Sequence, residues 1–172
     1  MKKNLMKMIS GAVLAILMLA VFAQISVSAQ TIIFSGETRR NTRSLEGSWD
    51  VQVTARNCQT NAVLRTFPAM ITYMRGGTLH EFGIGSGLLR GPGHGTWTYQ
   101  SELYFGQRYS SASQFFRFNA DGTHAGKQIN RAQIEVDGLG NSYTATTASE
   151  IYNPGGVLIA TGCVTTTGTR FE

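Results

Sequence analysis

The chain has few of the residues that mark most functional sites. Its 172 residues include two cysteines, three histidines and three prolines. Neither cysteine lies beside a histidine or in a CxxC pair, and the histidine spacing matches no zinc motif. The glycine-rich stretch 83–93 lacks the Gly-Lys-Ser/Thr of a phosphate loop, and Leu88 stands where a dinucleotide fingerprint needs its last glycine. These absences exclude a recognisable catalytic cysteine, zinc site, phosphate loop or dinucleotide site, so we expect no cofactor and no metal.

Positive charge is also scarce once the first residues are set aside. The formal net charge is +5, but Lys2, Lys3 and Lys7 supply three of these charges. The remainder of the chain carries 12 basic and 10 acidic residues, with Lys127 as its single lysine. Its cations are scattered, and no basic stripe is interleaved with aromatic residues, as nucleic-acid binding would need. We therefore expect no nucleic-acid partner.

The first 29 residues have the pattern of an export signal. Three lysines precede an apolar run over residues 8–22 in which Ser10 is the polar interruption, and Val27-Ser28-Ala29 offers a cleavage site before Gln30. The alternative is an uncleaved membrane anchor, but the apolar run is shorter than a bilayer requires. We expect a signal peptide (1–29), a flexible segment (30–44) and one domain (45–172). The domain is then exported to a periplasm or outside the cell, without stable membrane insertion.

The remainder of the chain alternates between apolar and polar residues with a period of two, which is typical of half-buried strands. Trp49, Val51, Val53 and Ala55 share the first apolar face. Turn-forming clusters at 119–122, 137–141 and 153–156 separate successive runs, as in a meander of hairpins. No helical periodicity competes with this pattern. Further strands are expected over 69–75, 78–82, 96–105, 113–119, 129–136, 142–152 and 157–171.

Seven or eight antiparallel strands joined by short turns leave exposed edges unless the sheet closes. The sequence therefore predicts an all-β fold, a single up-and-down antiparallel β-barrel, in preference to a sandwich. Cys58 ends the first strand-like run and Cys163 lies within the last. An even count in an exported chain predicts a disulfide between them, and two buried free thiols are the alternative.

Gly47-Ser48-Trp49 opens the first run and Arg170 closes the last, and the ring and the guanidinium can stack if these strands are neighbours. This pair resembles the signature of the calycins, the superfamily of lipocalins, fatty-acid-binding proteins and avidins. The chain is also similar to exported bacterial proteins of unassigned function and, more loosely, to allene oxide cyclase-like barrels. The calycin resemblance implies a small barrel in which Trp49 and Arg170 are structural.

Small residues dominate one face of each of the last two runs, and an eight-stranded barrel lined by them has room for one small ligand. These faces are Ala145, Thr147 and Ser149 in one run, and Ala160, Gly162, Val164, Thr166 and Gly168 in the other. The alternative is a packed interior. The favoured hypothesis is a binding module for a small apolar or amphipathic molecule, with the glycine-rich stretch covering the mouth. Its expected walls are Trp97, Tyr99, Phe116 and Phe118.

Two other functions rank below binding. A structural or interaction barrel with a filled core comes second. A cyclase- or isomerase-like enzyme comes third, and its acid–base candidates are His80, Glu81 and Glu102. His80, Glu81 and His94 also bracket the glycine-rich stretch, so a metal site of two histidines and a carboxylate is conceivable, although the sequence does not favour it.

Overall fold

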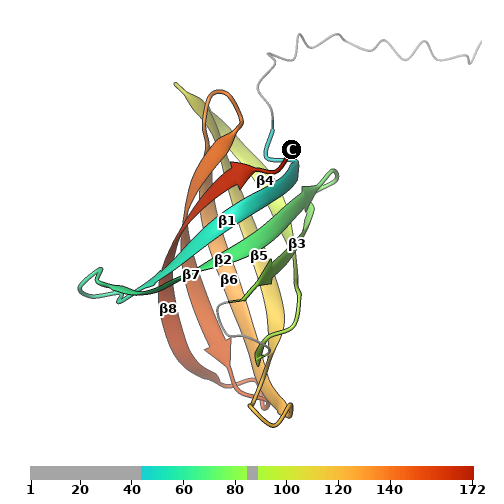
Figure 1. Ribbon diagram of the computed structural model, residues 1–172, viewed down its shortest axis with the longest axis vertical. Helices are drawn as coiled ribbons and strands as arrows, with labels where there is room; N and C mark the ends of the chain where they lie inside the picture. The colour runs from blue at the N-terminus through green and yellow to red at the C-terminus, as the bar shows by residue number, and fades with distance from the viewer. Residues whose placement is uncertain (1–43, 85–88) are drawn as a thin grey trace, which may run out of the picture. The chain divides into compact units, whose positions relative to one another are not determined.

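The computed structural model describes residues 44–84 and 89–172, and these form a closed antiparallel barrel. Each strand pairs with the next along the chain, and the first pairs with the last (Figure 1). The predicted all-β barrel is thereby confirmed, with eight strands. They are β1 (Gly47–Arg56), β2 (Val63–Met74), β3 (Thr78–Gly83), β4 (Gly93–Leu103), β5 (Gly106–Phe118), β6 (His124–Val136), β7 (Ser142–Tyr152) and β8 (Leu158–Arg170). The predicted signal peptide lies outside the described residues.

The hydrophobic core fills one end of the barrel, which we call the closed end. Here β1 begins and β8 ends, and the alternation of each strand turns its apolar residues inward. Leu45 precedes β1 and is fully buried among them. The largest members of this core are aromatic, so edge-to-face ring contacts hold the layer together. They are Trp49, Tyr73, Tyr109 and Tyr143, with Trp97 packed against them.

Trp49 and Arg170 join β1 to β8 at the closed end, as predicted. They are register partners, and the guanidinium carbon lies 4.3 Å from the centre of the Trp49 ring. Arg170 also donates hydrogen bonds of 2.7 Å to the carbonyl oxygens of Gly140, Glu46 and Ser44. The indole Nε1 of Trp49 donates to the Leu45 carbonyl at 2.9 Å. This pair therefore ties both chain ends of the domain to the barrel.

Gly47 has a physical reason to precede this tryptophan. Its φ of +123° lies in a region that side chains disfavour. A Cβ at this position would also lie 2.7 Å from Nη1 of Arg170. Glycine is therefore needed at this position of the Gly-x-Trp pattern, because a side chain would occupy the space of the Arg170 guanidinium.

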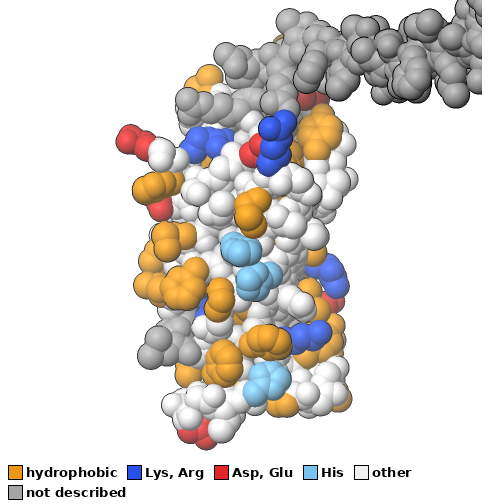
Figure 2. Space-filling view, turned by 90° about the vertical axis from the view of Figure 1, so that its right-hand side faces the viewer, with side chains coloured by type: hydrophobic (Ala, Val, Ile, Leu, Met, Phe, Trp, Pro, Cys, Tyr) orange, Lys and Arg blue, Asp and Glu red, His pale blue; other side chains and the backbone are white. Residues whose placement is uncertain are grey.

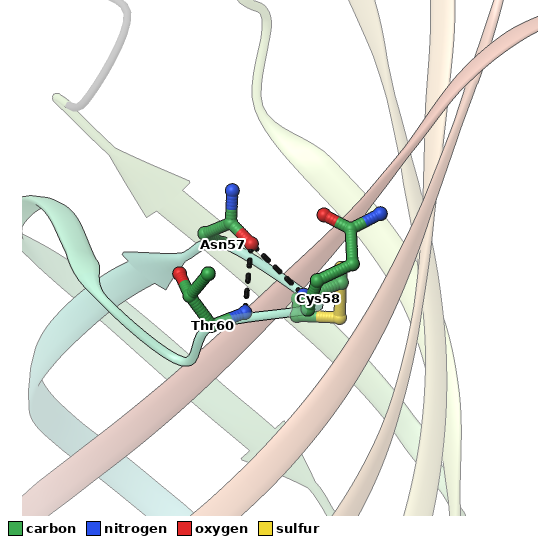
Figure 3. The surroundings of a disulfide bond; sticks show 5 residues. Asn57, Cys58 and Thr60 are labelled. Atoms are coloured by element: carbon green, nitrogen blue, oxygen red, sulfur yellow. Dashed lines mark hydrogen bonds between the residues drawn. A yellow bond between two sulfur atoms is a disulfide. The ribbon is translucent and has the colours of Figure 1, made fainter.

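The predicted Cys58–Cys163 disulfide is present. It lies at the opposite end of the β1–β8 seam, where the first and last strands pair and close the barrel. Arg56, the last residue of β1, pairs with Cys163 of β8, so the turn after β1 brings Cys58 within bonding distance. In that turn the Asn57 side-chain oxygen accepts 2.9 Å hydrogen bonds from the backbone N–H groups of Gln59 and Thr60 (Figure 3). The β1–β8 seam is thus held by stacking at one end and by a covalent bond at the other.

Strand β2 starts earlier than the sequence predicted, and Pro68 lies within it. Proline cannot donate a backbone hydrogen bond, so the expected strand started only after this residue. Pro68 pairs with Gln52 of β1, whereas the pairing of β2 with β3 stops at Ala69 and Gly83. The Pro68 carbonyl oxygen accepts a 3.4 Å hydrogen bond from the Ile84 N–H, just beyond β3, so the missing N–H falls where the pairing of β2 with β3 ends.

The strand predicted over 96–105 was wrong at its end. Tyr104 and Phe105 form the tight turn between β4 and β5, and both side chains are largely exposed. Leu103 and Phe105 continued the apolar alternation of Trp97 and Tyr99, which suggested a longer strand. Gly106 with its positive φ instead ends the turn, and β5 starts there. The next strand is accordingly longer than the predicted 113–119.

Candidate functional site: the interior cavity

Beyond the core, the interior of the barrel holds a cavity of about 430 Å³. This volume lies within the range of pockets that hold small molecules, about 300–1,000 Å³. The cavity extends from Tyr73 and Tyr143, which form its floor, to Asn57 and Cys58 in the turn after β1. That turn lies at the end of the barrel opposite the core, which we call the open end.

One wall of the cavity is apolar and comes from the first three strands. Alternation along β1 and β2 directs every second side chain inward, and apart from Arg65 near the open end these are aliphatic or aromatic. The wall consists of Val53 on β1, Phe67, Ala69 and Ile71 on β2, and Leu79 on β3. A hydrocarbon group placed against it would be shielded from water.

The opposite wall is a polar stripe on β6 and β7. The Asn130 side-chain oxygen accepts hydrogen bonds from Gln128 Nε2 at 2.9 Å and from Ser149 Oγ at 2.8 Å. Ala145, Thr147 and Ser149 face the cavity, as do Gly162, Val164 and Thr166 on β8. The expectation that the small-residue faces of the last two strands line open space is confirmed for these residues.

An ion pair lies in the cavity wall between the two ends of the barrel. Arg90 Nη2 donates to Glu81 Oε1 at 2.9 Å, and both side chains are mostly buried. The Arg90 guanidinium also lies over the ring of Phe115, 3.5 Å from its centre. A buried charge needs a partner, and each member of this pair supplies one for the other.

The floor carries the hydroxyl groups of Tyr73 and Tyr143. The Tyr143 side chain is 3% exposed, and its hydroxyl is buried without a hydrogen-bond partner among the described residues. The Tyr73 hydroxyl lies near enough for the two groups to affect each other's pKa, but the two do not form a hydrogen bond. Leaving such a group unpaired costs about 1–3 kcal/mol, so this feature needs an explanation.

Burial raises the pKa of both floor tyrosines, and the negative charge of Glu81 raises it further. The pKa of Tyr143 is raised well above 10.0. Both phenols therefore stay protonated, as hydrogen-bond donors, throughout the neutral range.

These shifts predict alkaline sensitivity. Above pH 10 the unfolded chain releases the tyrosine protons while the folded chain keeps them, so stability falls as pH rises. For two such groups the loss between pH 10 and pH 11 is about 2 kcal/mol. Urea unfolding at pH 9, 10 and 11 measures it. The double variant Tyr73→Phe/Tyr143→Phe should show a flatter decline, and an equally steep one would contradict the assignment.

The four expected wall residues lie elsewhere. Trp97 and Tyr99 pack their rings against Tyr109 at the closed end, at 5.6 Å in each case. Phe116 is 61% exposed on the outer face, and Phe118 lies beside Gly91. None of the four lines the cavity. Their role as ligand contacts stays a prediction, and the outward position of Phe116 argues against it.

On β5, the face of the strand that points inward is the opposite of the expected one. The sequence assigned Phe116 to the inner face, but Phe115 is the buried residue that lines the cavity. Both neighbours are aromatic, so alternation alone does not distinguish the two faces. Phe116 instead packs against His124 on the surface, with ring centres 5.6 Å apart.

The acid–base candidates divide between the two faces of the barrel. Glu81 faces the cavity, whereas Glu102 is exposed and accepts a hydrogen bond from Gln107. His80 pairs with His94 across β3 and β4, with ring centres 4.5 Å apart. Two histidines lie side by side on the outer surface in Figure 2. Because adjacent residues of a strand point in opposite directions, Glu81 is separated from this pair.

Sequence reasoning missed the floor tyrosines and the Arg90 partner of Glu81. Tyr143 stands in register with Ala145, Thr147 and Ser149, so the alternation that selected those three also indicates Tyr143. Arg90 lies outside the strands, where no periodicity applies. Of the glycine-rich stretch expected to cover the mouth, residues 85–88 lie outside the described residues.

No helix within residues 44–84 and 89–172 has the length and apolar character needed to cross a membrane. The disulfide is consistent with an oxidising compartment. Comparison of the chain with protein-family models, with curated proteins and with solved structures gave no match.

Proposed function

We propose that this protein is an exported binding protein whose barrel holds one small amphipathic molecule in its interior. The observation that carries the proposal is the cavity of about 430 Å³, which joins an apolar wall to a floor of buried hydroxyls. Ligand pockets combine apolar walls with a few placed polar groups in this way. The small residues of β7 and β8 that line the cavity support the same function, because they leave room for one ligand in an eight-stranded barrel.

Two observations support binding over the alternatives. A structural barrel needs no interior space, and close-packed protein interiors leave few voids larger than a water molecule. Glu81 is the one acid–base candidate of the sequence that lines the cavity, and its carboxylate is engaged by Arg90. Its charge is therefore already used to balance a buried guanidinium.

Filling the cavity tests this proposal. The neutral dye N-phenyl-1-naphthylamine, which fluoresces in apolar surroundings, is expected to bind the wild-type protein. Thr147→Trp places an indole in the cavity and should weaken dye binding more than about tenfold, which corresponds to about 1.4 kcal/mol. Fluorescence titration gives the affinity, and a thermal melt shows that the variant is folded.

The matched control is Thr146→Trp. Thr146 is the neighbour of Thr147 on β7, but it is exposed and does not line the cavity. This variant adds the same side chain and should bind the dye like the wild type. Equal affinities of the folded Thr147→Trp variant and the control would place the dye outside the barrel and refute an interior site.

A further inference from the structure

The polar atoms of the aromatic layer are paired at the closed end but not at the cavity floor. Trp49 Nε1 donates to Leu45, Trp97 Nε1 donates to Met74, and the Tyr109 hydroxyl donates to Gln107. The Tyr143 hydroxyl has no such partner among the described residues, although it is equally buried. The exception lies where the layer meets the cavity.

Counting hydrogens shows what the floor lacks. Ser111 on β5 lines the cavity, and its hydroxyl interacts with that of Tyr73. Tyr73, Tyr143 and Ser111 each carry one hydroxyl hydrogen. The Tyr143 hydroxyl hydrogen has no acceptor among the described residues, so it is left to donate to a group inside the cavity. The group that completes the floor is an oxygen acceptor.

The negative charge near the floor determines which kind of oxygen acceptor a ligand can place there. The Glu81 carboxylate acts electrostatically on both Tyr73 and Tyr143. A carboxylate ligand at the floor would meet this negative charge in a poorly hydrated space, where like charges repel strongly. Arg90, the cation in this part of the wall, is already paired with Glu81. The other cavity-lining cations, Arg56 and Arg65, lie near the open end, away from the floor. A neutral oxygen escapes the repulsion.

From these observations we propose that Tyr73 and Tyr143 form the head-group site of the cavity, and that they hold a neutral molecule by a ketone, aldehyde or ester carbonyl. The apolar part of this molecule lies along Val53, Phe67 and Ile71, toward the open end. This inference rests on the proposed binding function and narrows the class of ligand. It also accounts for the unpaired Tyr143 hydroxyl, since the bound carbonyl accepts its hydrogen bond.

A set of matched ten-carbon probes tests the inference. 2-Decanone, decanoate and decane differ in the head group, and each is titrated against the bound dye at pH 8. Wild-type protein is expected to bind 2-decanone at least tenfold more tightly than decanoate. Tyr73→Phe should weaken 2-decanone binding about tenfold, as loss of one buried hydrogen bond implies. The same variant should change decane binding less than about twofold.

Further variants keep the test decisive if Tyr73→Phe folds poorly. Tyr143→Phe removes the unpaired floor hydroxyl and should weaken 2-decanone binding in the same direction. Glu81→Gln removes the negative charge and frees Arg90, so it should strengthen decanoate binding. Near-ultraviolet circular dichroism compares the packing of the aromatic layer in each variant with that of the wild type.

The outcomes separate the inference from the function on which it rests. If decanoate binds as tightly as 2-decanone, or if the tyrosine variants weaken decane and 2-decanone equally, the head-group site is refuted while interior binding stands. Dye binding without displacement by any probe also refutes it. If the dye itself ignores Thr147→Trp, the binding function fails as well.

Discussion

Replacing Trp49 with alanine is expected to lower the free energy of unfolding by about 3–5 kcal/mol. The indole is 1% exposed and packs edge-to-face on Tyr143, with ring centres 4.9 Å apart. Its removal leaves a void in the closed end and takes away the surface on which Arg170 stacks. Because whole domains have stabilities of about 5–15 kcal/mol, this single change removes a large share. Urea unfolding followed by circular dichroism measures the loss.

Two further variants show whether the loss comes from burial. Tyr104→Ala removes an aromatic ring that is 93% exposed, so it should change stability by less than about 0.5 kcal/mol. Trp49→Phe keeps a ring but loses the hydrogen bond to Leu45, and an intermediate loss is expected. A Trp49→Ala variant as stable as Tyr104→Ala would show that the closed end does not hold the barrel together.

Removing the disulfide is expected to cost about 4–5 kcal/mol. Cys58 and Cys163 are 105 positions apart, and a cross-link that closes so long a loop restricts the unfolded chain strongly. The double variant Cys58→Ser/Cys163→Ser should unfold at a much lower urea concentration. It should also show a steeper dependence on urea, because an unfolded chain without the cross-link exposes more surface.

Chemical reduction provides the matched comparison. Wild-type protein unfolded in dithiothreitol should agree with the double variant to within about 0.5 kcal/mol, because in both cases the cross-link is absent. If the double variant instead retains the stability of the oxidised wild type, the seam between β1 and β8 is held by its hydrogen bonds and by Trp49 and Arg170 alone.

The sequence was most informative where one side of a strand is apolar and the other polar. Trp49, Val51 and Val53 alternate with polar residues, so both the strand and its inner face could be predicted. The disulfide and the pairing of Trp49 with Arg170 followed from the closure of the barrel, because closure makes the first and last strands neighbours.

The cavity was less accessible to such reasoning. On β5, Phe115 and Phe116 are both aromatic, and only the packing of the whole barrel decides which of them turns inward. Arg90 reaches Glu81 from a connection without periodicity. The importance of Tyr143 depends on a missing hydrogen bond, which is a property of three-dimensional contacts and not of residue type.

The seam between β1 and β8 also determines when the barrel can form. Trp49 pairs with Arg170, so β1 gains its second neighbour only after the rest of the domain has been synthesised. Bringing together segments so distant in the chain has a large entropic cost, and the stabilising contacts form only afterwards. Folding is therefore slow. Until then β1 presents a row of unpaired backbone groups, to which the strand of another molecule can add. A nascent chain of this protein is therefore most vulnerable to aggregation in the interval before β8 becomes available.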